Sequence, residues 1–224
     1  MNFDTSKTIG GIGAILAFIS VCMSVLFSYS GIIGFVGIIL MVVGLHGLSG
    51  HYREPGIFKY TLIGVVAGVV GIFLGVIVFF TVFLSNVNPL LHQLYPGWDG
   101  NLASLATMTP DASQLTPDKI DPATIYPVVT STVIMLAIMW IFAIIATYFI
   151  RRSLKQLSEK SNVGLFGTAG TLLLIGAFLT IIAIGVILIW IAILLLAIAF
   201  FQIKHQEPNT PPYDTYQPQT PPQQ

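Results

Sequence analysis

Few side chains in this sequence could carry out chemistry, and they lie far apart along the chain. His46 is the one ionisable side chain that falls inside a long apolar segment, near the end of that segment. An ionisable group within a membrane is a functional candidate because its burial in lipid is costly. We therefore keep His46 as a weak functional candidate. We expect a neutral imidazole that bonds to a neighbouring helix or faces interfacial water.

The other residues that often form sites are isolated. His51, His92 and His205 are too scattered to predict a metal site, and Cys22 is the single cysteine of the chain. No Asp, Glu, Lys or Arg falls in the middle of an apolar segment, which argues against a proton-coupled carrier, a voltage sensor or an intramembrane protease. We predict no catalytic, cofactor-binding or metal site, and no enzymatic activity.

Hydroxyl side chains are the polar residues of the apolar segments. Such hydroxyls usually bond to the carbonyl one turn back in their own helix, or to a neighbouring helix. A serine nucleophile would need a base within reach, and no base is placed to serve. We therefore predict structural roles for the following residues: Ser20, Ser24, Thr130, Ser131, Thr132, Thr171 and Thr180.

The composition places the chain in the membrane class. Of its 224 residues, 55% are hydrophobic and 8% are charged, with a mean hydropathy of +0.87. A soluble domain carries roughly 25% charged residues, so a chain with this few could not cover its surface in water. The formal net charge is zero, which gives no indication of nucleic-acid binding.

Two uncharged runs are too long for one membrane crossing. Residues 161–203 would form a helix of roughly 65 Å, about twice the hydrocarbon thickness of a bilayer. We predict that this run folds into a tight hairpin that turns near Gly185. Residues 9–48 form a second such run, with a turn near 27–31. The weak similarity between the segments after Gly34 and Gly185 leaves a duplication of the two hairpins open.

These features predict an all-α, polytopic membrane bundle with two tight hairpins that flank two single spans. We predict a transmembrane domain over residues 1–204, an extracellular loop at about 85–126, and a disordered Pro/Gln-rich tail at 205–224. Cleavage of the first span as a signal peptide after Ser30 is conceivable, but its n-region is poorly charged and we favour an uncleaved span. The six predicted spans are 9–28, 31–49, 60–84, 127–150, 165–183 and 186–203.

The distribution of basic residues predicts the orientation. Arg53 and Lys59 follow the second span, and the basic connector 151–160 follows the fourth. Because cytoplasmic loops are enriched in Lys and Arg, six spans place these segments and both termini in the cytoplasm. The loop at 85–126, which contains four aspartates and one lysine, then lies outside. We expect the cell membrane as the location.

The third span contains the most specific packing pattern of the chain. Gly64, Gly68, Gly71 and Gly75 are spaced four, three and four residues apart. They therefore fall on one narrow helix face, which lets another helix approach closely. We predict a helix-packing seam, either within the monomer or between subunits of a homo- or hetero-oligomer.

Several segments resemble an uncharacterised, mainly archaeal family of multi-pass membrane proteins, the domain of unknown function 996. These segments are 5–13, the Gly-rich second span that leads into His51-Tyr52 and Ile57-Phe58, and the ending 198–204. The resemblance covers residues 1–204 and implies a membrane location, but no activity and no functional residues. Some related chains carry a zinc-ribbon-like tail with cysteines, which this tail lacks.

From these observations we expect a non-enzymatic membrane component that acts through helix packing and contacts with partners in the lipid bilayer. The alternative is a small transporter or channel for an uncharged or apolar solute, with a path lined by hydroxyls and glycine backbone. A continuous polar cavity between the spans would favour transport, and a tightly packed bundle would oppose it.

Overall fold

The computed structural model describes residues 2–23, 30–101, 103–111, 113 and 122–204, and within these ranges it contains helices and no strand. All six α-helices are long and apolar enough to cross a membrane, when α5 is taken together with the 3-10 turn that follows it. The predicted all-α bundle of six membrane helices is confirmed. The helices are α1 (Phe3–Met23), α2 (Ser30–His51), α3 (Pro55–Leu94), α4 (Pro122–Ser161), α5 (Gly164–Leu179) and α6 (Ile184–Gln202), with short 3-10 turns η1 (Ser104–Thr107) and η3 (Thr180–Ile182).

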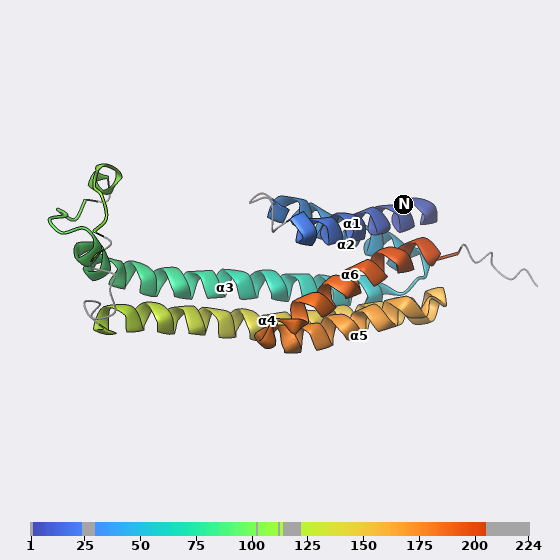
Figure 1. The fold of residues 1–224 in the computed structure, drawn as a ribbon. Coiled ribbons are helices and arrows are strands. Elements are labelled where there is room, and N and C mark those ends of the chain that lie inside the picture. Colours follow the sequence, from blue (N-terminus) through green and yellow to red (C-terminus); the bar gives the residue numbers. More distant parts are fainter. Residues whose placement is uncertain (1, 24–29, 102, 112, 114–121, 205–224) are drawn as a thin grey trace, which may run out of the picture.

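Helices that follow one another in the sequence also pack against one another. Each consecutive pair is in contact, and α1 also packs against α6, which closes the series. Figure 1 shows that α3 and α4 run side by side and continue beyond the four shorter helices to the segment that joins them. The opposite end of the bundle contains the start of α1, the α2–α3 and α4–α5 connections and the end of α6. We call this the basic end.

The two central helices exceed their predicted lengths. Both α3 and α4 have 40 residues, which corresponds to roughly 60 Å each. Helix α3 continues ten residues past the predicted end of the third span, and α4 includes all of the connector 151–160. The charges of this connector lie on one face of the helix, whereas Leu154 and Leu157 on the other face are buried. An amphipathic segment of this kind can continue a membrane helix beyond the lipid.

The largest buried side chains gather near the basic end. Phe166 of α5 and Phe200 of α6 are fully buried and meet edge to face, with ring centroids 5.2 Å apart. Leu48, Ile57 and Leu157 belong to the same cluster. The segments from α2 to α6 therefore share one packed core at this end.

The α5–α6 hairpin turns near Gly185, as predicted, although another residue adopts the turn conformation. The positive φ of the turn, 61°, belongs to Ala183, two residues before Gly185. Gly185 instead lies in α6 and packs against the carbonyl of Gly176 on α5. A side chain at Gly185 would collide with this backbone, so close packing explains this glycine.

The left-handed conformation of Ala183 leads to the first prediction. An L-residue in this region costs roughly 1–2 kcal/mol relative to right-handed conformations, and glycine avoids most of this cost. We expect Ala183→Gly to raise the free energy of unfolding by about 1 kcal/mol, measured as a higher unfolding temperature in detergent. Ala177→Gly, at a right-handed helical position, is the control and should be destabilising. A loss of stability in Ala183→Gly would contradict the strain at this turn.

Two predictions fall on parts of the chain that the structure does not describe. The turn of the first hairpin includes residues 24–29, and the tail covers 205–224; both lie outside the described residues. Cleavage after Ser30 and disorder of the tail therefore stay predictions.

Candidate functional site

The connection between α2 and α3 has a defined geometry. Arg53 adopts a left-handed conformation with φ of 51°, which reverses the chain after α2. The Ser49 hydroxyl donates to the Glu54 carbonyl (2.8 Å), and the Glu54 N–H donates to the Ser49 carbonyl (3.0 Å). Pro55 then begins α3. The first N–H groups of a helix have no helical acceptor, so the missing N–H of proline costs no hydrogen bond at this position. These contacts hold the connection in one conformation.

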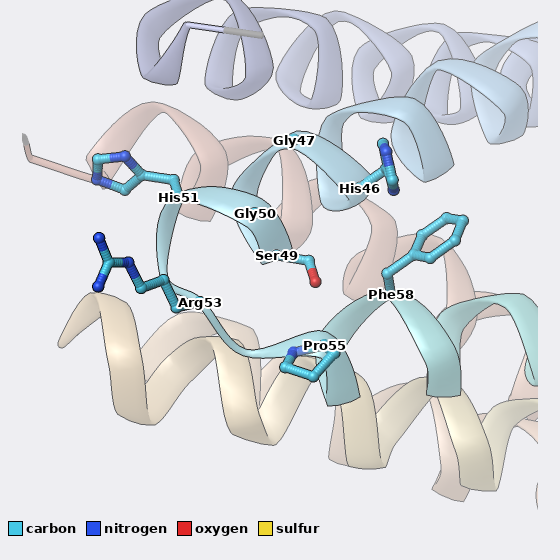
Figure 2. A pocket seen from close by; sticks show the side chains of 8 residues that line it. All are labelled: His46, Gly47, Ser49, Gly50, His51, Arg53, Pro55 and Phe58. Carbon is cyan, nitrogen blue, oxygen red and sulfur yellow. The ribbon is translucent and has the colours of Figure 1, made fainter.

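A hollow of about 670 Å³ opens at this connection (Figure 2). The His46 imidazole packs edge to face on the Phe58 ring, with centroids 4.5 Å apart. Figure 2 shows His51 and Arg53 together at the other end of the hollow, with the Ser49 hydroxyl between the two groups. Its lining consists of His46, Gly47, Ser49, Gly50, His51, Arg53, Pro55 and Phe58.

The charge of the hollow favours anions. Its lining contains one guanidinium and two imidazoles, and no carboxylate. The neighbouring Glu54 carboxylate is 3.4 Å from Lys160 Nζ, so its charge is offset by a cation of α4. Burial raises the pKa of the adjacent Tyr52 hydroxyl, which therefore stays neutral at physiological pH. The guanidinium and imidazole groups of the lining can donate hydrogen bonds to an anionic group. The Ser49 hydroxyl already donates to the Glu54 carbonyl.

The structure brings His46 and His51 to one hollow, which the scattered histidines of the sequence did not predict. His51 also contacts Phe3 at the start of α1, with ring centroids 4.5 Å apart. His92 lies far along α3 against Trp98 (5.0 Å). Within the described ranges, no three His, Cys, Asp or Glu side chains are grouped as metal ligands would be. The sequence signal for this hollow was the Arg53–Gly56 turn directly after a histidine-containing helix end.

The four glycines of α3 face α4 of the same chain. A β-carbon on Gly64 would lie 2.8 Å from the Ala146 carbonyl oxygen, and one on Gly75 would lie 2.9 Å from Met139 Cγ. At Gly71 it would collide with Phe142, whereas at Gly68 it would meet Ala146 Cβ at 3.7 Å. The structure thus places this seam between two helices of one chain, over about three turns of α3.

A second set of glycines joins α1 to α2. A β-carbon on Gly44 would lie 2.6 Å from the Cα and N atoms of Gly10, and one on Gly37 would lie 2.7 Å from the N atom of Ala17. Gly13 is equally close to the α2 backbone. The two helices therefore touch through their backbones.

The structure confirms the structural role of the helix hydroxyls where it describes their bonds. Each of five predicted hydroxyls donates to a carbonyl three or four residues earlier; they are Ser20, Ser131, Thr132, Thr171 and Thr180. A buried bond between helices joins the hydroxyls of Thr61 and Ser153 (2.7 Å), and the Ser153 hydroxyl also contacts the Ile57 carbonyl (2.6 Å). The Thr61–Ser153 bond was not predicted, because Ser153 lies in the segment 151–160, which was interpreted as a connector.

The loop at the far end is held by a carboxylate. Asp99 accepts bonds from the Asn101 backbone N–H (3.0 Å) and the Ser104 hydroxyl (2.7 Å). The Asn101 N–H and then the Ser104 hydroxyl lower the pKa of Asp99 below its usual value, since both stabilise the carboxylate. The bonds to Asp99 should therefore be intact above the ordinary pKa of an aspartate and be lost as the pH falls through the lowered value.

The fold and its contacts define a multi-pass, all-α membrane protein with glycine-mediated helix packing and a basic hollow at one end. The chain belongs to the family described as "Protein of unknown function (DUF996)", which matches residues 33–194. It is 27% identical over 203 residues to "Uncharacterized protein MJ1644" of Methanocaldococcus jannaschii, a match that covers 91% of this chain and 94% of that protein. No solved structure matches it significantly.

Proposed function

We propose that this protein is a non-enzymatic component of the cell membrane that binds another polypeptide through the part of α3 and α4 that extends beyond the shorter helices. In this proposal both termini are cytoplasmic, because eight of the nine lysines and arginines lie at the basic end.

One observation carries the proposal: in the part of the chain that the structure describes, no other helix lies against the sides of the outer half of the α3–α4 pair. Figure 1 shows α3 and α4 continuing there as a pair without the other four helices. Phe80 is 52% exposed and Leu84 is 62% exposed. We call this region the outer pair; its large exposed apolar side chains include Ile77, Phe80, Leu84, Val129, Val133 and Leu136.

The glycine faces do not offer such a surface. The glycines of α3 lie against α4, and those of α2 lie against α1. A partner would therefore contact the large side chains of the outer pair, where the aromatic ring of Phe80 offers broad contact area.

The transport alternative receives no support from the hydroxyls or the hollow. The helix hydroxyls bond to carbonyls of their own helices, so they are not free to line a polar path. The hollow is lined by residues 46–58 at the basic end, and its lining contains no residue from the middle of a helix. Close helix contacts at Gly44 and Gly64 also oppose a channel between these pairs.

Site-specific photo-crosslinking in native membranes tests the proposal. A photoreactive phenylalanine analogue is placed at Phe80 or Leu84 of the outer pair, and at Phe178 of α5 as the control; all three are exposed in the isolated chain. We expect a discrete polypeptide adduct, identified by mass spectrometry as a second copy or another membrane protein, from positions 80 and 84 but not from 178. Lipid adducts alone at all three positions would overturn the proposal.

A further inference from the structure

The depth of the six helices in the membrane has to be derived, because two of them are much longer than the other four. If the bilayer enclosed the four short helices, the outer pair would extend roughly 30 Å beyond them into water. Its exposed side chains are apolar, with Ile77 at 58% and Phe80 at 52% exposure. Exposure of such a patch to water is strongly unfavourable. The bilayer therefore has to be located from the chemistry of α3 and α4 and not from the helix ends.

Aromatic and basic side chains meet at one level of the α3–α4 pair. The Arg152 guanidinium lies over the Tyr60 ring, 4.5 Å from its centroid. The Tyr60 ring stacks on Phe149 at 6.4 Å, and the preceding residue of α4, Tyr148, is exposed. Tyrosines with adjacent arginines are typical of the boundary between hydrocarbon and headgroups. This level lies well inside the bundle, since α4 continues nine residues past Arg152.

The cations at this level lack acidic partners. In the described parts of the chain, ion pairs join Lys155 to Glu159 and Lys160 to Glu54. No carboxylate of the described residues pairs with Lys59, Arg151 or Arg152, which are all exposed. These three cations, which we call the basic belt, lie within three residues of Tyr60 or Phe149 along α3 and α4. The phosphate groups of anionic lipids complement exposed cations at such a level.

The distances along α3 and α4 fit a bilayer that starts at the basic belt. From Tyr60 to Ser85, the 25-residue separation corresponds to roughly 37 Å of helix, and from Tyr148 to Tyr126 the 22-residue separation gives roughly 33 Å. Both values match a hydrocarbon layer of about 30 Å with its two boundaries. The outer pair then lies in lipid.

The short hairpins are displaced relative to this layer. A β-carbon on Gly170 of α5 would lie 3.1 Å from the Arg151 Cα atom, so Gly170 is level with the basic belt. From Gly170 to the end of η3 at Ile182, twelve residues extend roughly 18 Å, short of the far boundary. Helix α1 is level with α6, because Phe18 stacks on Trp190 at 4.9 Å.

The composition of the α5–α6 turn agrees with this depth. Ile181 is 69% exposed and Ile182 is 58% exposed, and the turn has no charged residue. Its backbone is bonded internally, with the Ala183 N–H on the Thr180 carbonyl (3.0 Å) and the Val186 N–H on the Ala183 carbonyl (3.1 Å). A turn with exposed isoleucines and no charged residue suits hydrocarbon better than water.

We propose that the basic belt of Lys59, Arg151 and Arg152 binds the phosphate groups of anionic lipids and marks one membrane boundary, so that the α5–α6 turn ends inside the hydrocarbon. In this arrangement α3 and α4 cross the whole bilayer. The α5–α6 hairpin enters and leaves through the basic side, which leaves the predicted side of both termini unchanged.

A lipid-binding experiment tests the belt. The full-length protein is reconstituted in nanodiscs of phosphatidylglycerol and phosphatidylcholine, and retained lipids are counted by native mass spectrometry. We expect preferential retention of phosphatidylglycerol that inorganic phosphate does not displace, and a loss of at least threefold in R151Q/R152Q. K204Q, which removes a charge at the helix end outside the belt, should retain lipid as the native protein does. Equal retention of the two lipids, an equal loss in K204Q, or displacement by inorganic phosphate would overturn the proposal.

An accessibility experiment tests the depth of the turn in the same nanodiscs. With Cys22→Ser as background, Ile181→Cys is compared with Asn101→Cys in the exposed far loop, with both faces of the membrane open to a water-soluble maleimide. We expect rapid labelling at 101, at least tenfold slower labelling at 181, and quenching of a fluorophore at 181 by mid-chain nitroxide lipids. Labelling at 181 as fast as at 101, without such quenching, would place the turn in water and contradict the inference.

Discussion

Gly64→Ala should destabilise the protein by about 2 kcal/mol, as expected for an added methyl group in a closely packed site. Its β-carbon would lie 2.8 Å from both the Ala146 carbonyl oxygen and Ile150 Cγ1, so α3 and α4 would have to separate. Because the backbone oxygen cannot rotate away as a side chain can, this clash should outweigh the gain in helix propensity from alanine. The unfolding temperature in detergent, followed by circular dichroism, measures the effect.

Gly68→Ala is the matched control in the same seam. Its β-carbon would meet Ala146 Cβ at 3.7 Å, an ordinary van der Waals contact. We expect unchanged or slightly higher stability from this variant. Equal losses in the two variants would show that the close contact at Gly64 does not decide the stability of the seam.

Gly44→Ala should have an effect of similar or larger size, about 2–3 kcal/mol, on the α1–α2 hairpin. Its β-carbon would lie 2.6 Å from two backbone atoms of Gly10 and 2.8 Å from the Ser6 carbonyl oxygen. Neither helix can relieve these contacts by a side-chain rotation, so α1 would be pushed away from α2. The free energy of unfolding from denaturant titration in mixed micelles gives the magnitude.

The control for Gly44 lies on the same helix. A β-carbon on Gly50 would meet no atom within 4 Å, so Gly50→Ala should be neutral or slightly stabilising. If Gly44→Ala proved as stable as Gly50→Ala, the backbone contact between α1 and α2 would be refuted.

The sequence predicted the number and type of helices because hydropathy and length decide both. Runs 9–48 and 161–203 are each too long for one crossing, and each forms a hairpin of two helices in the structure. The glycine spacing likewise placed four residues on one face of α3. The glycine spacing could not identify α4 as the helix that packs there, because spacing on one helix carries no information about which helix approaches it.

The extent of α4 was missed for a physical reason. Charges at Arg151, Arg152 and Lys155 suggested a connector, whereas burial of Leu154 and Leu157 against the other helices keeps this segment helical to Ser161. Tertiary packing of one amphipathic face decided the structure here. The hollow was missed for another reason, because His46, His51 and Phe58 come together only where the left-handed Arg53 reverses the chain.

The α5–α6 hairpin was predicted to turn near Gly185, and it does. A glycine is suited to such a turn because it tolerates positive φ. The structure uses Ala183 for the turn and Gly185 for the close contact with Gly176. Sequence alone does not separate a glycine required by conformation from one required by packing.

A disulfide between Gly68→Cys and Ala146→Cys tests most directly that the α3–α4 seam lies within one chain. A β-carbon on Gly68 lies 3.7 Å from Ala146 Cβ, a separation suited to a disulfide. With Cys22→Ser as background, mild oxidation in the membrane should consume both thiols and leave the protein monomeric on non-reducing electrophoresis. The pair Gly68→Cys and Ile145→Cys, whose second residue is exposed on another face, should stay reduced. A disulfide-linked dimer from the 68–146 pair, or free thiols in both pairs, would contradict the account.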